Sequence, residues 1–450
     1  MPPSREQRVP SRYVPLVYFA AAHLSLLAAF AVIALAPRSV LGFYYTPRML
    51  LVVHLVTVGW ITSSILGALY LIGPMALRTA MPTDETDRRI ASLYVIGGAG
   101  IVLSFLAQAS WGVGLSGLIV LLCVGWVGRK LLPSLLATSG QAAPAPGVKL
   151  HFVLAFANFG LAAATGALIA FDRVLDLLPG YRLAHVTAHA HLAFLGWATM
   201  MVMAAGYRLL PMFLPSQMPS GARLIASGLI YETGVIVLFV SLLAQAEAWT
   251  RAGAVLTVLG IAAFFAHVAW MKRHPRTPAR GLPRPDLGAV QALLAIGYLG
   301  VSAGLGLYVV FEPGVFEPVV FEPRAFHPAP RGGTEATLRL TMIYGVTGLL
   351  GFLAQMIAGI STRLLPIFAW MTAFTTGPDG VRVPPEKTPH ELVHRPAQVA
   401  SFVLWVAGVP ALAAGLYLEH VALTSAAGTG LFLAVAAAAA GHYVAFRSTR

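Results

Sequence analysis

The sequence predicts an all-α polytopic membrane protein with twelve transmembrane helices, and two observations lead to this prediction. The 450 residues are 58% hydrophobic and only 10% charged, whereas soluble domains are about 45–50% apolar and about 25% charged. Long apolar segments also recur along the chain, and several exceed the roughly 20 residues that an α-helix needs to cross a bilayer. The composition therefore excludes a soluble cytosolic or secreted enzyme and makes the lipid bilayer the expected environment.

Polar breaks separate the apolar segments into twelve candidate spans. In chain order they cover residues 13–36, 49–77, 89–110, 112–136, 148–171, 183–212, 222–246, 251–271, 287–310, 338–368, 397–418 and 420–446. Proline and glycine mark several of the gaps between them, as in residues 143–147 and 377–380. We therefore expect a single membrane domain over residues 1–450.

The arginines and lysines predict how the spans are oriented. With a cytoplasmic N-terminus, 22 of the 30 basic residues fall on the cytoplasmic side and 8 on the other, as the positive-inside rule expects. Both termini are then cytoplasmic, in a membrane of the bacterial inner-membrane type. The formal net charge of +13 is explained by topology, so no nucleic-acid partner is expected.

Three of the predicted spans resemble one another in sequence. Residues 54–74, 191–211 and 346–366 align without a gap, share one glycine position, have glycine or alanine at a second, and end in a proline. The Arg-Leu-Leu-Pro ending is identical in the second and third of these segments. Such internal similarity indicates a repeated structural unit.

The helices after these segments extend the similarity. Ile-Ala-Ser or Val-Ala-Ser opens the next span at residues 90–92, 225–227 and 399–401. Leu-Ala-Gln-Ala closes it at residues 106–109 and 243–246. We therefore predict three pseudo-equivalent four-helix arcs, covering residues 13–136, 148–271 and 287–446. Small residues in the aligned segments favour close helix packing.

Histidines near the outer ends of two spans are the candidate ligands. His185 and His189 are four residues apart, so they share one helical face and are spaced to chelate one metal ion. His191 points to another side of the same helix, and the alignment makes His54 its equivalent. Four imidazoles at one depth suit haem iron, non-haem iron or copper. The alternative is that each histidine only hydrogen-bonds a neighbouring helix.

Other polar side chains within the spans are secondary candidates. Tyr231 and Glu232 in the seventh span have three possible roles: proton transfer, metal ligation or acceptance of hydrogen bonds. Tyr344 occupies in the third repeat the position of His189 in the second, and packing is its commoner role. His23 lies in the middle of the first span and is a weaker candidate than the histidines of the sixth span.

Several motifs are absent from the sequence. The chain has no Walker A motif, no dinucleotide fingerprint and no C-x-x-C-H site for covalent haem. Its single cysteine, Cys123, excludes internal disulfides and cysteine-ligated zinc. The outer loop 311–335 repeats Phe-Glu-Pro three times, which predicts a docking site for an electron-donor protein or partner subunit, or a neutral duplication in a tolerant loop.

The arrangement of these residues resembles subunit I of the haem-copper oxidases, nearest to the cbb3-type and nitric oxide reductase branch. The resemblance is carried by residues 54–74 and 189–211 and by the three-repeat pattern. It implies a low-spin haem b on His54 and an active-site metal, copper or iron, on a histidine of the sixth span. If the chain is an enzyme, it implies an oxidoreductase of the cytochrome c oxidase or nitric oxide reductase type.

The sequence departs from that family at two places. The tenth span has no histidine where the family has His-x-His, and Tyr231 and Glu232 stand where the family has further metal ligands. Met342 or His327 would have to replace the missing ligands. The resemblance therefore implies a divergent, stand-alone relative.

Three functions follow from the sequence. The leading hypothesis is a metalloprotein that binds haem b, copper or both near its outer face, with His54 and His191 as cofactor ligands, for electron transfer or for oxygen or nitric oxide chemistry. A transporter that kept the fold without redox chemistry is the first alternative. The second is a non-catalytic membrane subunit or sensor that docks partners through loop 311–335 or loop 369–396.

Overall fold

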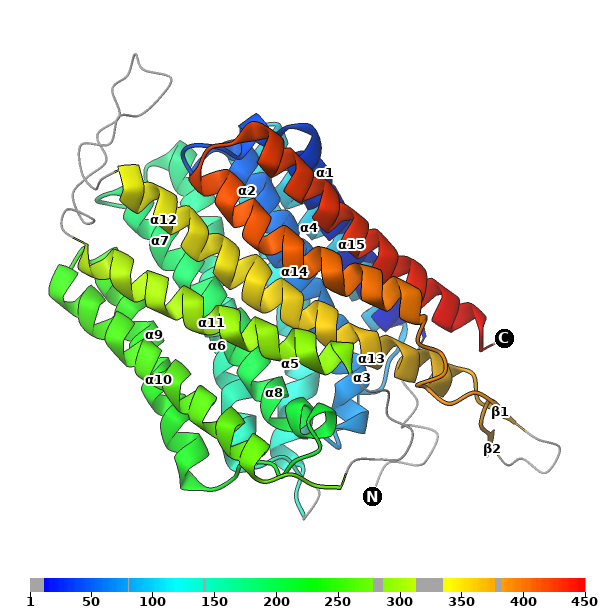
Figure 1. Cartoon of the computed structure of the whole chain (residues 1–450). Helices are drawn as coiled ribbons and strands as arrows, with labels where there is room; N and C mark the ends of the chain where they lie inside the picture. The colour runs from blue at the N-terminus through cyan, green and yellow to red at the C-terminus, as the bar shows by residue number, and fades with distance from the viewer. Residues whose placement is uncertain are drawn as a thin grey trace.

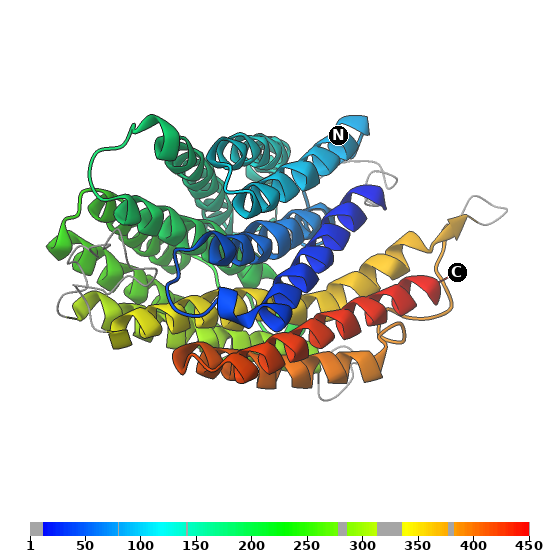
Figure 2. The same ribbon diagram turned by 90° about the horizontal axis from the view of Figure 1, so that it is seen from above.

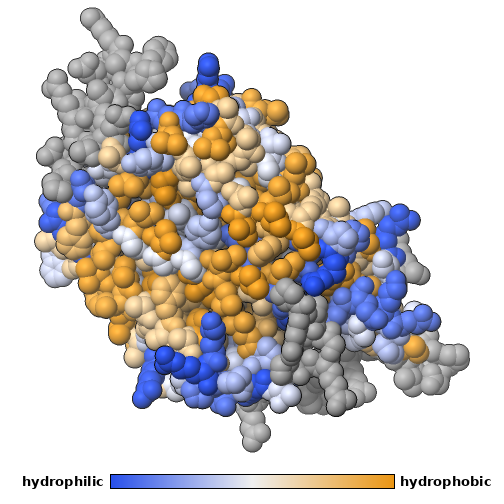
Figure 3. Space-filling model, viewed as in Figure 1, coloured by the Kyte–Doolittle hydropathy of each residue, from blue (hydrophilic) through white to orange (hydrophobic). Residues whose placement is uncertain are grey.

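The computed structural model describes residues 12–79, 81–140, 143–277, 286–312, 335–376 and 382–449. In this part of the chain, twelve helices are long and apolar enough to cross a membrane, which confirms the predicted all-α polytopic fold (Figure 1). Their surface forms a broad apolar band with hydrophilic residues gathered towards the ends (Figure 3). Helices satisfy their own backbone hydrogen bonds, which is why an apolar chain of this kind folds into them in lipid.

Nine of the spans are single helices, and three are interrupted by a π-helical segment. The second span is α2, η3 and α3, the sixth is α7, η4 and α8, and the tenth is α12, η5 and α13. The elements are α1 (Tyr13–Leu35), α2 (Pro47–His54), η3 (Leu55–Thr62), α3 (Ser63–Met75), α4 (Glu85–Leu106), α5 (Ser110–Ala137), α6 (Pro146–Leu175), α7 (Arg182–His191), η4 (Leu192–Thr199), α8 (Met200–Phe213), α9 (Ala222–Leu243), α10 (Glu247–Arg273), α11 (Leu287–Phe311), α12 (Glu335–Val346), η5 (Thr347–Ala354), α13 (Gln355–Thr372), α14 (Arg395–Tyr417) and α15 (Val421–Arg447).

The three interrupted spans form the centre of the bundle. In their most apolar windows, 61%, 78% and 61% of the residues of the second, sixth and tenth spans are buried, whereas no other span exceeds 50%. The other nine helices surround them in the order α1, α4, α5, α6, α9, α10, α11, α14, α15, and α15 packs against α1 to close the ring. Buried apolar side chains from α1 to α15 form one continuous core. The repeated segments of the sequence are therefore the interior of the molecule.

The two ends of the helical bundle can be told apart by the chain termini. α1 begins and α15 ends at the same end, as their blue and red ribbons show in Figure 2. We call this end the near face and the opposite end the far face. The second, sixth and tenth spans all begin at the far face, because each follows an odd number of earlier spans.

The π segments fall at aligned positions of the three repeated sequences. Each is eight residues long, and each begins one residue after the first residue of the gap-free alignment, at Leu55, Leu192 and Thr347. A π segment leaves carbonyl groups in irregular positions and is frequent at functional sites. In two of the three segments the fourth residue accepts a tyrosine hydrogen bond: Tyr94 donates to Val58 O at 2.7 Å, and Tyr231 donates to Leu195 O at 3.0 Å.

The turns that join the third and fourth helices of each predicted repeat are also alike. Gln108, Gln245 and Glu419 lie in these turns with φ of 55°, 53° and 50°. α4 and α9 have the same length of 22 residues, so Tyr94 and Tyr231 are equivalent. With these two tyrosines placed opposite each other, residues 90–92 fall opposite 227–229, two positions from the sequence match with 225–227. The arrangement in three arcs stays a prediction.

Close helix packing relies on small residues, as predicted. Gly359 of α13 and Gly288 of α11 face each other so closely that a Cβ atom on Gly359 would lie 2.9 Å from the Gly288 carbonyl oxygen. A Cβ atom on Gly288 would lie 2.8 Å from the Gly359 oxygen. This contact fixes the tenth span against the ring.

The structure differs from the prediction at some boundaries. The third span was predicted from residue 89, but α4 begins at Glu85, because Asp84 and Asp87 form a capping box that starts the helix in a charged segment. A two-residue antiparallel hairpin, β1 (Thr375–Thr376) and β2 (Arg382–Val383), lies in the loop after the tenth span. Residues 313–334 lie outside the described residues, and with them most of the predicted docking loop 311–335 and His327.

Candidate functional site

A cavity of about 370 Å³ lies between the second and sixth spans and the ring helices α4, α5 and α6, and it reaches the start of the tenth span. Small-molecule sites commonly measure about 300–1,000 Å³. Apolar side chains form most of its lining. His54, His189, His191 and Tyr344 are the histidine and tyrosine side chains deep in this lining. The cavity therefore gathers three of the four predicted ligands.

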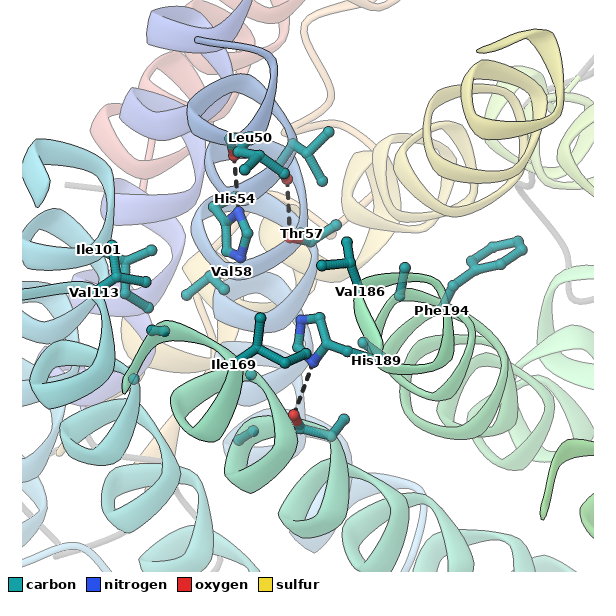
Figure 4. Close-up of a pocket in the computed structure, with 18 of the residues that line it drawn as sticks. Leu50, His54, Thr57, Val58, Ile101, Val113, Ile169, Val186, His189 and Phe194 are labelled. Carbon is teal, nitrogen blue, oxygen red and sulfur yellow. Dashed lines mark hydrogen bonds between the residues drawn. The ribbon is translucent and has the colours of Figure 1, made fainter. Parts of the chain in front are cut away.

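His54 enters the cavity from the last residue of α2. Thr46 caps this helix by accepting a hydrogen bond from Met49 N at 3.2 Å, and Pro47 occupies its first turn. The Nδ1 atom of His54 lies 2.8 Å from the carbonyl oxygen of Leu50, one turn earlier in the same helix. The ring packs against Phe105 of α4, with 4.8 Å between ring centroids. The hydrogen bond between Nδ1 and Leu50 O directs Nε2 of His54 to the cavity (Figure 4).

His189 enters the same cavity from the sixth span. Its Nδ1 atom lies 2.8 Å from the carbonyl oxygen of Ala162 on α6, so its ring is held by a neighbouring helix (Figure 4). Gly166 makes room for the ring, because a Cβ atom there would lie 2.7 Å from His189 Cε1. His54 and His189 are each the eighth residue of their helices, about 10 Å below the far face at 1.5 Å per residue.

His191 and Tyr344 form a stacked pair on another side of the cavity. Their ring centroids lie 5.7 Å apart with 18° between the ring planes, and Phe194 packs edge-on against Tyr344. The Nδ1 atom of His191 lies 2.8 Å from Thr187 O. His191 thus points away from His189, as the helical spacing predicts, but the cavity is wide enough for both to line it.

The remaining predicted site residues do not line the cavity. His185 is buried one helical turn nearer the far face than His189, and its Nδ1 atom has no hydrogen-bond partner among the described residues. Tyr231 donates its hydroxyl to Leu195 O, as described above. Glu232 accepts a hydrogen bond from Asn158 at 2.9 Å, and Asn158 also donates to Gly196 O at 3.1 Å. Tyr231 and Glu232 are therefore connected to the π segment η4.

Polar residues lie at the far-face rim of the cavity. Gln108 comes from the turn between α4 and α5, Ser110 is the first residue of α5, and Arg173 comes from the last turn of α6. The Arg173 guanidinium lies 5.9 Å from the centroid of the Tyr45 ring, which also lines the cavity. Burial, reinforced by Tyr181, raises the pKa of the neighbouring Tyr44 to about 12, so this phenol is neutral at pH 7. Arg173 is the charged side chain in the described lining.

The histidine arrangement is what a metal ligand needs. A metal-ligating histidine usually donates its other ring N–H to a carbonyl or carboxylate, which fixes the tautomer and orients the ring. His54 and His189 both have Nδ1 at a backbone carbonyl and Nε2 left for a ligand. In the described part of the chain, however, no group of three or more His, Cys, Asp or Glu side chains is placed to hold a metal ion. The site is suited to a group that needs two protein ligands.

Sequence reasoning missed the side chains that complete the site. Phe105, Gly166 and Arg173 were not singled out, because their roles depend on how α4 and α6 face the central spans. Arg173 had a signal, since an arginine in the last turn of a helix is placed to meet an anionic group at that helix end. A comparison with known protein families found no matching family, and a comparison with curated proteins found no matching relative.

Proposed function

We propose that this chain is an inner-membrane electron-transfer protein that binds haem b in the cavity, with His54 and His189 as the two residues that would hold it. One observation carries the proposal: two imidazoles from different central spans face one largely apolar cavity, and each has Nδ1 at a backbone carbonyl. The proposal replaces His191 by His189 as the partner of His54, because His191 is stacked on Tyr344.

The surroundings of the two imidazoles suit a porphyrin. The lining is apolar around His54 and His189, and it becomes polar at the far face with Gln108, Ser110 and Arg173. A macrocycle held between the histidines would have apolar walls, and its propionates would reach the rim. A guanidinium pairs well with a carboxylate in such a position.

Two protein ligands favour electron transfer over oxygen or nitric oxide chemistry. Haem supplies a one-electron redox couple when bound, and its reactivity with small ligands depends on an open axial position. His54 and His189 would both hold the haem, which would then supply electron transfer. A copper or non-haem iron centre of the oxidase type needs more ligands than the described residues gather. His185 therefore has no metal-binding role in this proposal.

The orientation belongs to the same proposal. The excess of arginine and lysine at the near face makes that face cytoplasmic, so the haem lies close to the outer surface. An electron donor or acceptor would then approach the far face, where loop 311–335 begins and ends. Reporter fusions placed after α3 and after α4 test the orientation, with a cytoplasmic signal expected from the first and an outer signal from the second.

Absorption spectra of the purified protein test the proposal. The wild type is expected to show the Soret and α bands of a six-coordinate low-spin haem, with about one haem per chain. His54→Ala and His189→Ala should each remove or strongly shift these bands. His274→Ala is the matched control, because this histidine stacks on Trp270 at the near end of α10, with 4.2 Å between ring centroids. Haem-free wild-type protein from haem-replete cells would overturn the proposal.

The transporter hypothesis has less support from the site. The transporter hypothesis predicts that Glu232, at mid-membrane depth, lines a substrate or proton path. Glu232 instead accepts a hydrogen bond from Asn158 and does not line the cavity. Haem-free protein that moves a solute into liposomes would favour transport over electron transfer.

A further inference from the structure

A second histidine cluster lies between the first and last helices of the ring. His23 is in the middle of α1, and His442 is in the last third of α15. Their ring centroids are 5.4 Å apart and the ring planes meet at 83°. Trp60, from the π segment η3, packs edge-on against His23 with 5.2 Å between centroids. Neither histidine lines the cavity proposed to bind haem.

One ring nitrogen of each histidine lacks a hydrogen-bond partner among the described residues. His23 Nδ1 lies 2.8 Å from the Phe19 carbonyl oxygen, so it is the protonated nitrogen of a neutral ring, and Nε2 carries the lone pair. His23 Nε2 and His442 Nδ1 are both buried, and neither has a hydrogen-bond partner among the described residues. Buried polar atoms are normally satisfied, so two such nitrogens in adjacent rings need an explanation.

Close contacts join α1 and α15, the two helices that carry these histidines. Ser425 of α15 donates a hydrogen bond to Ala34 O of α1 at 2.6 Å. A Cβ atom on Gly428 would lie 2.8 Å from Ala34 N, so the two helices touch through their backbones there. His23 and His442 lie on the same pair of helices, towards the near face from this contact.

We propose that His23 and His442 form a two-imidazole site for a monovalent d¹⁰ metal ion, cuprous copper. Such an ion is satisfied by two ligands, whereas zinc needs about four and calcium or magnesium at least six. No described His, Cys, Asp or Glu is placed to add a third ligand to this pair. Imidazole is a good ligand for copper.

Charge also selects a monovalent ion. The two neutral rings bring no negative charge, and burial of a divalent ion in an apolar bundle without a counter-charge is very costly. A single positive charge costs less. The ion would join the first and last helices and would stabilise the closed ring.

Anaerobic titration of the detergent-purified full chain with Cu(I), in competition with a Cu(I)-specific chelator, tests the site. The wild type should bind one equivalent more Cu(I) than His23→Ala or His442→Ala, and Ag(I) should behave in the same way. His274→Ala and His189→Ala should keep this equivalent. Wild-type protein that shows no haem bands but keeps this Cu(I) equivalent would leave this inference standing while overturning the proposed haem site.

A second pair of variants guards against loss of folding. His442→Cys replaces imidazole with a soft thiolate and should retain Cu(I) binding, whereas His442→Leu of similar volume should lose it. Ag(I) should raise the unfolding temperature of the wild type and of His442→Cys, and should leave His442→Leu unchanged. Equal Cu(I) stoichiometry in the wild type and His442→Leu would overturn the inference.

Discussion

The Nδ1 atom of His189 on α7 lies 2.8 Å from the carbonyl oxygen of Ala162 on α6. This bond joins two spans that are separated by a loop at the far face, and it sets the direction of an imidazole that lines the cavity. His54, in contrast, is oriented by Leu50 of its own helix. One ligand therefore depends on tertiary packing and the other on local structure, and the two respond differently to substitution.

A first prediction concerns the space that α6 leaves for His189. Gly166→Ala places a methyl group 2.7 Å from His189 Cε1, so the ring must move although every ligand is kept. Overpacking of this kind costs about 1–3 kcal/mol, which corresponds to a roughly 5- to 150-fold weaker retention of haem at about 1.4 kcal/mol per tenfold change. Haem content per chain after dilution with apomyoglobin as acceptor measures it.

Gly160→Ala is the control for this experiment. Gly160 lies on the same helix, and a Cβ atom there meets no other atom within 4 Å. This variant should retain haem like the wild type. Equal retention in the Gly166 and Gly160 variants would show that His189 is not a ligand.

The sequence predicts the fold well because the bilayer imposes a strong constraint. Lipid requires long apolar helices, so hydropathy alone locates all twelve spans. The depth of His54 and His189 also follows from the sequence, since a helix rises by a fixed distance per residue. The π segments do not follow, because Leu55, Leu192 and Thr347 begin ordinary apolar stretches with no local signal of a changed hydrogen-bond pattern.

The grouping of the ligands could be predicted only in part. Spacing places His185 and His189 on one face of a helix, but it does not say where a cavity lies along that face. His185 does not line the cavity although its neighbour Val186 does, so the structure separates this pair and joins His189 to His54 instead. That pairing depends on the contact of α6 with the sixth span, which short-range patterns do not encode.

A second prediction concerns the stacked pair at the start of the tenth span. Tyr344→Leu removes the ring that stacks on His191 and should lower stability by about 0.5–1.5 kcal/mol beyond the loss of buried area. Tyr344→Phe keeps the ring and should behave like the wild type. Unfolding in mixed micelles of increasing SDS content measures both. Equal destabilisation by the two variants would mean that the hydroxyl, and not the stack, matters.

A third prediction follows from the pKa of Asp84, which lies before α4 at the near face. The backbone N–H of Asp87 donates to this carboxylate and lowers its pKa. The carboxylate therefore stabilises the fold fully above its unfolded pKa of about 3.9, and this contribution is lost as the pH falls through the lower folded value. Asp84→Asn keeps a capping oxygen but does not titrate.

The difference in unfolding temperature between the wild type and Asp84→Asn should thus be constant from pH 7 to pH 5 and should shrink below about pH 4. Thermal unfolding followed by circular dichroism at a series of pH values measures it. A difference in unfolding temperature that does not change down to pH 2 would contradict the helix cap as the origin of the lowered pKa of Asp84. The exposed neighbour Arg89→Gln serves as a variant that leaves the cap intact.

A fourth prediction concerns the buried ion pair between α4 and α5. Lys130 Nζ lies 2.5 Å from Asp87 Oδ2, the Asp87 side chain is fully buried, and Tyr70 and Trp126 each donate to its Oδ1 atom at 3.1 Å. Removal of one member leaves an uncompensated buried charge, which costs about 3–5 kcal/mol. Asp87→Asn and Lys130→Met should each destabilise by this amount in SDS unfolding. The double variant buries no charge, so its loss of unfolding free energy should be smaller than the sum of the losses in the two single variants. Strict additivity of these losses would show that the pair is solvated in the membrane-bound protein.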